Sequence, residues 1–369
     1  MFDILRDWYN RNFTDPQAVI LALVLIAVFV FLWLFGEVLA PVLVALVLAY
    51  LLEGVVATLV ARGIPRTLSV VLVLLLFISV SLVVLFGLVP VLSKQVTELV
   101  RALPDMIAAG QEQLLRLPEL YPDIFTVEQI EQLIGTLRAE LGSAGQQVLS
   151  FSLARLGTVI AILIYAVLVP LIVFFTLKDK DLLLAWASKH FVPKRSELSF
   201  RVWKEVDLKI ANYIRGKFVE ISIVWVTTYI IFALMGLNYS LLLSFLVGIS
   251  VIIPFVGAVA VTVPIAIIAF FQWGLGAQFV WLLLIYQIIQ ILDGNVLVPL
   301  LFSEVVNLHP LAIITAVVFF GGLWGIWGVF FAIPLATLIQ AVMNAWPRRG
   351  DSGEVLSDAD GTLATDVTG

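Results

Sequence analysis

Polar side chains recur at every third residue within an apolar stretch near the C-terminus. Gln287, Gln290 and Asp293 have this spacing, and Asn295 follows two residues later. On a helix they form a polar stripe that drifts slowly around one face. Amides and a carboxylate can replace water around a small solute, and the carboxylate can also take up a proton. The alternative is hydrogen bonding between helices, worth roughly 0.6 kcal/mol per contact in membranes.

Two apolar segments beside this stripe contain residues that interrupt helices. The first, residues 241–271, contains Pro254, Gly257 and Pro264. Paired interruptions of this kind are typical of transporter solute sites, although small residues also serve tight helix packing. The breaks predicted in the second segment, residues 311–346, are at Gly321, Gly322, Gly325, Gly328 and Pro334.

We therefore predict a solute or ion path near the stripe and the first interrupted segment. Unwound backbone at membrane depth is tolerated only where protein or a water-filled cavity covers it, so the breaks should line the path. The residues assigned to it are Asp293, Asn295, Gln290, Gln287, Pro254 and Gly257.

The composition places these segments in a membrane. Hydrophobic residues make up 62% of the chain, charged residues 13%, and the mean hydropathy is +1.11. Soluble domains average roughly 45–50% apolar and about 25% charged. Apolar runs at 18–35, 38–60, 68–89 and 156–177 approach the roughly 20 residues that cross a hydrocarbon core, and backbone in lipid must be helical.

The predicted fold is an all-α, polytopic transmembrane bundle of about eight passages, two of them broken or re-entrant. Lys and Arg cluster at residues 6–11, 62–66, 178–217 and 348–349. The positive-inside rule puts these clusters, and therefore both termini, in the cytoplasm. Had residues 311–346 crossed twice, Arg348 and Arg349 would lie outside, so charge favours one kinked passage or a re-entrant loop.

Charge and hydropathy together predict six regions. Acidic residues outnumber basic ones in residues 93–150, and apolar residues at helical spacing predict two helices there, with a capping box from Thr126 to Gln129. Residues 198–217 predict a basic amphipathic helix that contacts anionic lipid and does not bind nucleic acid. The regions are 1–91, membrane helices 1–3; 92–150, an extracytoplasmic helical hairpin; 151–177, membrane helix 4; 178–217, a cytoplasmic basic segment; 218–347, a C-terminal membrane region; and 348–369, a disordered acidic tail.

Residues 218–347 contain no Lys or Arg and three acids. Besides Asp293 these are Glu220, expected to reach the cytoplasmic interface one turn after Lys217, and Glu304, expected with His309 in a short outside loop.

The sequence lacks the residues that several kinds of chemistry require. There is no cysteine, which excludes disulfides and thiolate metal sites. The sequence has no HExxH metal motif, no dinucleotide loop and no GxxxxGK[ST] phosphate loop. The only histidines, His190 and His309, are not placed for nucleophilic catalysis. We therefore expect no cofactor, no metal and no enzymatic activity.

Five segments carry a family resemblance: IANYIRGK at 210–217, GLNYSLLL at 236–243, IIPFVGA at 252–258, DGNVLVPLLFSEVVNLHPL at 293–311 and GGLWGIWGVFFAIPLATLI at 321–339. In order and spacing they resemble the PerM-type branch of the autoinducer-2 exporter (AI-2E) family. The resemblance is specific over about residues 205–346 and elsewhere extends to the hydropathy layout.

The resemblance implies a bacterial inner-membrane permease that forms a homo-oligomer, plausibly a pentamer. Members are associated with export of the quorum-sensing signal autoinducer-2, and some relatives with sodium/proton antiport. Two hypotheses follow: a transporter that moves a small polar solute outward, with Asp293 coupling flux to protons, or a non-transporting oligomeric scaffold whose outside hairpin binds envelope partners. Solute flux through reconstituted protein discriminates between them.

Overall fold

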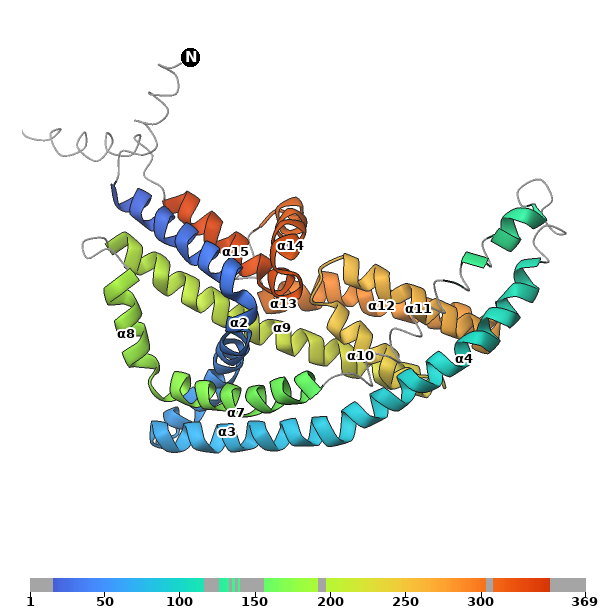
Figure 1. Ribbon diagram of the computed structural model, residues 1–369, viewed down its shortest axis with the longest axis horizontal. Coiled ribbons are helices and arrows are strands. Elements are labelled where there is room, and N and C mark those ends of the chain that lie inside the picture. Colours follow the sequence, from blue (N-terminus) through green and yellow to red (C-terminus); the bar gives the residue numbers. More distant parts are fainter. Residues whose placement is uncertain are drawn as a thin grey trace, which may run out of the picture. The chain divides into compact units, whose positions relative to one another are not determined.

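The computed structural model describes residues 16–115, 126–132, 135–136, 139, 156–191, 197–302 and 308–345. All regular structure in these ranges is helical, which confirms the predicted all-α class (Figure 1). The chain divides into two compact units. One comprises residues 40–179 and 211–307, and the other comprises residues 1–39, 180–210 and 308–369. The predicted tail at 348–369 lies outside the described residues.

The N-terminal helix α2 spans Pro16–Ala61, 46 residues without a break. Two passages separated by a turn between residues 35 and 38 were expected, and the prediction of a turn there is wrong. Gly36 introduces no turn, and Pro41 lies inside the helix, where a proline removes only one backbone hydrogen bond. Helix α2 belongs to both units, dividing at residues 39 and 40.

The next helices form one continuous helical stretch. Helix α3 (Arg66–Val83) continues through a π-helical turn, η1 (Val84–Leu88), into α4 (Val89–Leu115). The expected third passage and the first helix of the outside segment are therefore not separated by a turn. The second helix predicted for residues 92–150 begins with the expected capping box: Thr126 N–H donates to Gln129 Oε1 (3.2 Å), and Gln129 N–H donates to Thr126 Oγ1 (3.3 Å).

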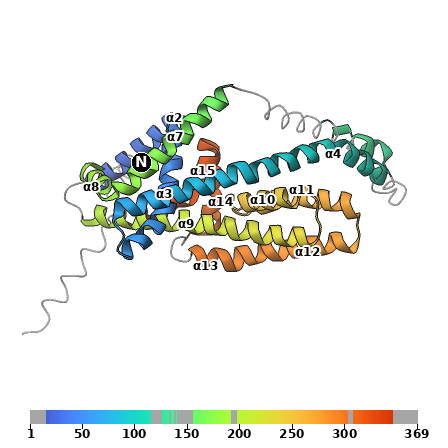
Figure 2. The ribbon, with the colours of Figure 1, turned by 90° about the horizontal axis from the view of Figure 1, so that it is seen from below.

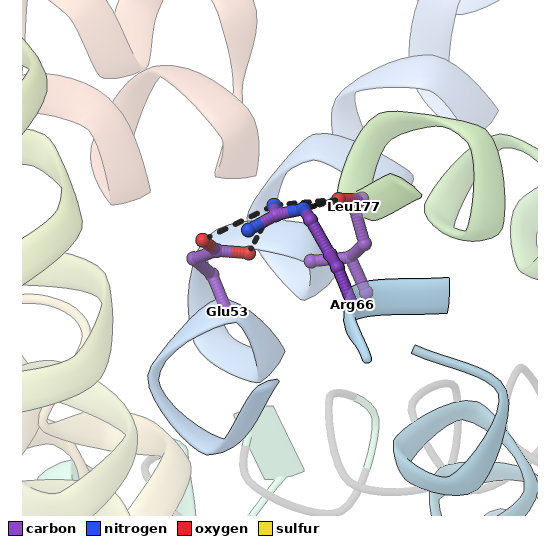
Figure 3. A network of polar contacts seen from close by, with 3 residues as sticks. All are labelled: Glu53, Arg66 and Leu177. Atoms are coloured by element: carbon purple, nitrogen blue, oxygen red, sulfur yellow. Dashed lines mark hydrogen bonds and ion pairs between the residues drawn. The ribbon is translucent and has the colours of Figure 1, made fainter. Parts of the chain in front are cut away.

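Helices α2 and α3 pack against α7 (Leu156–Lys178) around Val56, Val70 and Val173, which are fully buried. Beside this core, Arg66 joins all three helices (Figure 3). Its Nη2 donates to Glu53 Oε2 (3.2 Å), and Nη2 and Nε donate to the Leu177 carbonyl (2.7 and 3.1 Å). The last carbonyls of a helix have no partner within it, so Arg66 satisfies one at the end of α7 while neutralising Glu53.

The remaining helices of this unit run from residue 211 to 302. Helix α9 (Glu197–Leu234) continues the expected basic segment directly into an apolar span, after the short helix α8 (Lys180–Phe191). Figure 2 shows the second half of α9 running beside the helices that follow it. Those helices are α10 (Ser240–Ser250), α11 (Val256–Trp273), α12 (Ala277–Leu292), the π-helical turn η2 (Asp293–Leu297) and α13 (Val298–Phe302).

The first interrupted segment breaks between α10 and α11, at residues 251–255. Phe255 there has a left-handed φ of 64°. A Cβ on the buried Gly257 would overlap the Ser250 carbonyl, so only glycine lets the two helix ends approach this closely. The break expected at Pro264 is wrong, because α11 continues through it. A helix held by packing on both sides tolerates the loss of one backbone hydrogen bond.

The second interrupted segment is a helical hairpin in the other unit. Helices α14 (Pro310–Trp324) and α15 (Ile326–Ala345) meet at Gly325, whose φ is 58°. A Cβ on Gly328 would overlap the Phe320 carbonyl. The 15 residues of α14 rise about 22 Å, less than the roughly 30 Å of a hydrocarbon core. This length fits the re-entrant alternative.

Only one of the breaks predicted in this second segment is a break in the structure. Gly321 and Gly322 lie within α14, and Gly328 and Pro334 lie within α15, so the helices are interrupted at Gly325 alone. Gly321 and Gly328, one on each side of the turn, instead allow close packing of α14 on α15.

Five helices among the described residues are long and apolar enough to cross a membrane. They support a multi-pass membrane protein, whereas the count of eight stays a prediction. The five are Val38–Ala61, Arg66–Met106, Asp207–Leu234, Val256–Trp273 and Ala277–Phe302, and shorter apolar helices accompany them.

Candidate functional site

A buried ion pair lies near the start of the apolar part of α9. Lys217 and Glu220 are one helical turn apart, and Lys217 Nζ lies 2.7 Å from Glu220 Oε2. The two residues are only 4% and 1% exposed. A charge removed from water costs several kcal/mol unless it is paired, so each group requires the other.

The Lys217 ammonium has two further contacts, both with residues distant in sequence. Nζ donates to the Val251 carbonyl (3.1 Å) and lies 5.4 Å from the centre of the Phe302 ring. Val251 is the first residue after α10, where the helix break frees carbonyls. A Cβ on Gly216 would lie 2.8 Å from Phe302 Cε1, so this glycine lets the ring approach α9. A carboxylate, a carbonyl and an aromatic face thus hold the ammonium.

Asp293 is the second carboxylate of this group. It is half-buried at the first position of η2 and is close enough for its charge to act on both Lys217 and Glu220. Its Oδ1 atom is buried and has no hydrogen-bond partner. Gln290, one turn earlier on α12, has a buried Nε2 that also lacks a partner. A donor and an acceptor therefore remain available beside the ion pair.

The polar stripe predicted from sequence divides in the structure. Gln290 and Asp293 lie on the inner side of the helix, whereas Gln287 is exposed. Asn295 is also exposed, and its Nδ2 donates to the Ile291 carbonyl (2.9 Å) within its own helix. The widened π-helical turn η2 begins at Asp293 and rotates the side chains that follow, which accounts for Asn295, whereas Gln287 lies before it on α12.

Pro254 and Gly257 contribute through the backbone. They lie in and just after the break that leaves the Val251 carbonyl free to accept from Lys217. No contact between either residue and Asp293 occurs among the described interactions. Gly321, Gly322, Gly325, Gly328 and Pro334 belong to the α14–α15 hairpin of the other unit.

Two residues, Glu304 and His309, were expected in a short outside loop. Glu304 lies outside the described residues. His309 precedes α14, where its Nδ1 accepts a hydrogen bond from Leu311 N–H (3.2 Å) and caps the helix.

Sequence reasoning missed Lys217 and Glu220. Lys217 was assigned to the cytoplasmic basic segment, and Glu220 was expected at the cytoplasmic interface, which its burial contradicts. The signal was present: opposite charges three residues apart at the start of an apolar run can neutralise each other inside the protein. No sequence pattern, however, indicated that Val251 and Phe302 would complete the contacts of Lys217.

The arrangement has an imbalance of charge. Two carboxylates face one ammonium, so the group carries a net charge of −1 when all three are ionised. A monovalent cation or a proton would neutralise it, and charge left uncompensated in a membrane is unfavourable. Among the described residues, no cluster of three His, Cys, Asp or Glu side chains is arranged to hold a metal ion.

Comparison with known proteins identifies the relatives of this chain. Residues 21–348 match the model of the AI-2E family transporters. The chain is 47% identical over 347 residues to the "Putative permease PerM" of Escherichia coli (strain K12), covering 94% of this chain and 98% of that protein. It is 30% identical over 290 residues to the "Putative transport protein YueF" of Bacillus subtilis (strain 168), covering 77% of each chain. The chain therefore belongs to the AI-2E family of transporters and is a multi-pass membrane transport protein.

Proposed function

We propose that this protein is a secondary permease that exports a small polar solute across the bacterial inner membrane, in exchange for protons taken up at Asp293. The observation that carries the proposal is the pair of partnerless polar atoms, Asp293 Oδ1 and Gln290 Nε2, beside the Lys217–Glu220 ion pair. A polar atom without a partner at membrane depth costs free energy, so such atoms are retained where a solute, ion or water serves as the partner.

The helix break explains how a solute could reach these atoms. Residues 251–255 separate α10 from α11, and the carbonyl of Val251 is held by the Lys217 ammonium. Loss of this hydrogen bond would remove one of the contacts between the break and α9, beside the apolar packing of Val251 with Val224. In the proposed cycle, a proton on Asp293 removes one negative charge from the group, and solute then leaves past Gln290.

The solute class follows from the chemistry of the site. A donor amide and an acceptor carboxylate suit a small polar molecule with hydroxyl groups, and the proposed solute is of the autoinducer-2 type. Exchange of Na⁺ for protons is the second candidate, favoured by the net negative charge of the group. The proposal also includes assembly into a homo-oligomer, a pentamer, with both termini in the cytoplasm.

The test is solute flux through the full chain reconstituted in tight lipid vesicles. Autoinducer-2 efflux is followed with an imposed pH gradient, and Na⁺-dependent proton movement is followed with a pH-sensitive dye inside the same vesicles. We expect the wild type to move autoinducer-2 faster than protein-free vesicles. Flux of neither probe through folded protein would favour the oligomeric scaffold and refute the permease.

A matched pair of variants tests the position of the path. Asp293→Asn removes the carboxylate on the inner side of the helix and should abolish the dependence of flux on the pH gradient. Gln287→Asn shortens the exposed amide two turns earlier and should leave flux unchanged. Equal effects of the two substitutions would place the path elsewhere.

A further inference from the structure

The seam between α9 and α12 contains a third buried polar atom that the proposed solute site does not use. Thr228 is fully buried, and its Oγ1 has no hydrogen-bond partner. Other helical hydroxyls behave differently: Thr58, Ser222 and Thr262 each donate to the carbonyl four residues earlier, at 2.7–2.8 Å. The Thr228 hydroxyl does not donate to the carbonyl four residues earlier.

The contacts of α9 place Thr228 on the same seam as Asp293. At one end of the seam, Tyr213 on α9 meets Phe302 (ring centres 5.7 Å apart), and at the other end Phe232 meets Tyr286 (6.3 Å). The two helices therefore run antiparallel (Figure 2). Thr228 precedes Phe232 by one turn, which places it on the face that packs toward α12.

The partnerless atoms consequently lie near one another along the seam. Between the two ring contacts, Asp293 lies opposite about residue 224 of α9 and Gln290 opposite about residue 227, so Gln290 Nε2 and Thr228 Oγ1 lie at nearly the same level, beyond Asp293 Oδ1. From the level of Asp293 to Thr228 the helix rises about 6 Å, a distance that about two water molecules in contact would cover. Buried polar groups are nearly always hydrogen-bonded to protein or to ordered water, so three neighbouring exceptions along one seam call for a shared partner.

We propose that the seam between α9 and α12 holds a file of water molecules that extends from Asp293 past Gln290 to Thr228. The Thr228 hydroxyl and the Gln290 amide orient the file, and protons move along it to the carboxylates. The delivery of protons rests on the proposed exchange of protons for solute, whereas the water file itself does not.

The absence of cysteine from the chain makes the file directly testable. Thr228→Cys introduces a single thiol of nearly the same size as the hydroxyl it replaces. Thr227→Cys is the matched control. Thr227 is the adjacent residue, but it lies on the outer surface of a candidate membrane span, where a thiol would face lipid and not water. The probe is Ag⁺, which is small enough for a file one water wide and reacts with thiols in contact with water. Thiols that remain free are counted with a maleimide after the protein is denatured.

We expect Ag⁺ to block Thr228→Cys at least tenfold faster than Thr227→Cys in membranes. Equal or slower blocking at position 228 in protein of native elution volume would overturn the water file. Thr228→Val provides a second measurement that does not depend on a thiol. If the hydroxyl binds water, the melting temperature should fall or stay unchanged; a rise would show that a dry, unsatisfied hydroxyl had been removed, and would also overturn it.

The two proposals can fail separately. Rapid blocking at position 228 in a protein that moves no solute would refute the permease and keep the water file. Proton-coupled flux with position 228 protected would keep the permease and refute this route.

Discussion

Removal of the Glu220 carboxylate should strongly destabilise the protein. In Glu220→Gln the Lys217 ammonium stays buried, 4% exposed, without the carboxylate that now lies 2.7 Å away. Breaking a buried ion pair in this way typically costs 3–5 kcal/mol. The Val251 carbonyl, the Phe302 ring and the nearby Asp293 still compensate part of the charge, so we expect the lower end, about 3 kcal/mol.

The double variant Lys217→Met/Glu220→Gln separates the pair from the positions themselves. It removes both charges of the pair and leaves only the half-buried Asp293 carboxylate, which can bind a proton; it also gives up the Phe302 contact and the hydrogen bond to the Val251 carbonyl, the latter a loss of about 1 kcal/mol. The double variant should therefore be more stable than Glu220→Gln alone. The free energy of unfolding is measured in mixed micelles by titration with a denaturing detergent.

An exposed ion pair of the same residue types provides the control. Lys94 and Glu98 lie 3.8 Å apart, with side chains 77% and 49% exposed. Such pairs contribute about 0–1 kcal/mol, so Glu98→Gln should change stability little. The reasoning is refuted if Glu220→Gln unfolds like the wild type, or if the double variant is as unstable as the single one.

Two further predictions concern packing of the helices. Arg66→Gln removes the charge-assisted bonds to the end of α7 and should cost about 1.5–3 kcal/mol in the same unfolding assay, whereas Arg62→Gln, at an exposed neighbour, should cost little; equal losses would contradict the role of Arg66. Gly328→Ala should lower stability by about 1–3 kcal/mol because its Cβ would overlap the Phe320 carbonyl, while Gly322→Ala meets nothing within 4 Å; a stable Gly328→Ala protein would show that the hairpin can open without cost.

The sequence predicted the helical membrane architecture because long apolar runs permit no other backbone structure in lipid. It predicted the capping box at Thr126 and the interrupted segment between α10 and α11 for the same kind of reason, since both depend on local chemistry. It failed where a helix continues through a residue that could end it. Pro41 and Pro264 lie inside long helices, because one missing hydrogen bond is a small loss beside the packing of the whole element.

The candidate site was only half visible in the sequence. Asp293 and Gln290 stand out as polar residues in an apolar run, and the structure places both on the inner side of the helix. Lys217 did not stand out, because its position at the end of a basic segment resembles an ordinary interfacial lysine. Its burial depends on contacts with Val251 and Phe302, more than 30 residues away, which no local pattern specifies.

The central claim is that Asp293 couples the outward movement of a small polar solute to protons. It is tested most directly by the accumulation of autoinducer-2 in vesicles that contain the protein and carry an imposed pH difference. With the membrane potential held at zero, a difference of one pH unit is worth about 1.4 kcal/mol per proton, so exchange of one neutral solute for one proton should produce about a tenfold concentration ratio. We predict this ratio for the wild type and a ratio of about one for Asp293→Asn. Accumulation that is equal in the two proteins, or absent in the wild type, would contradict the account.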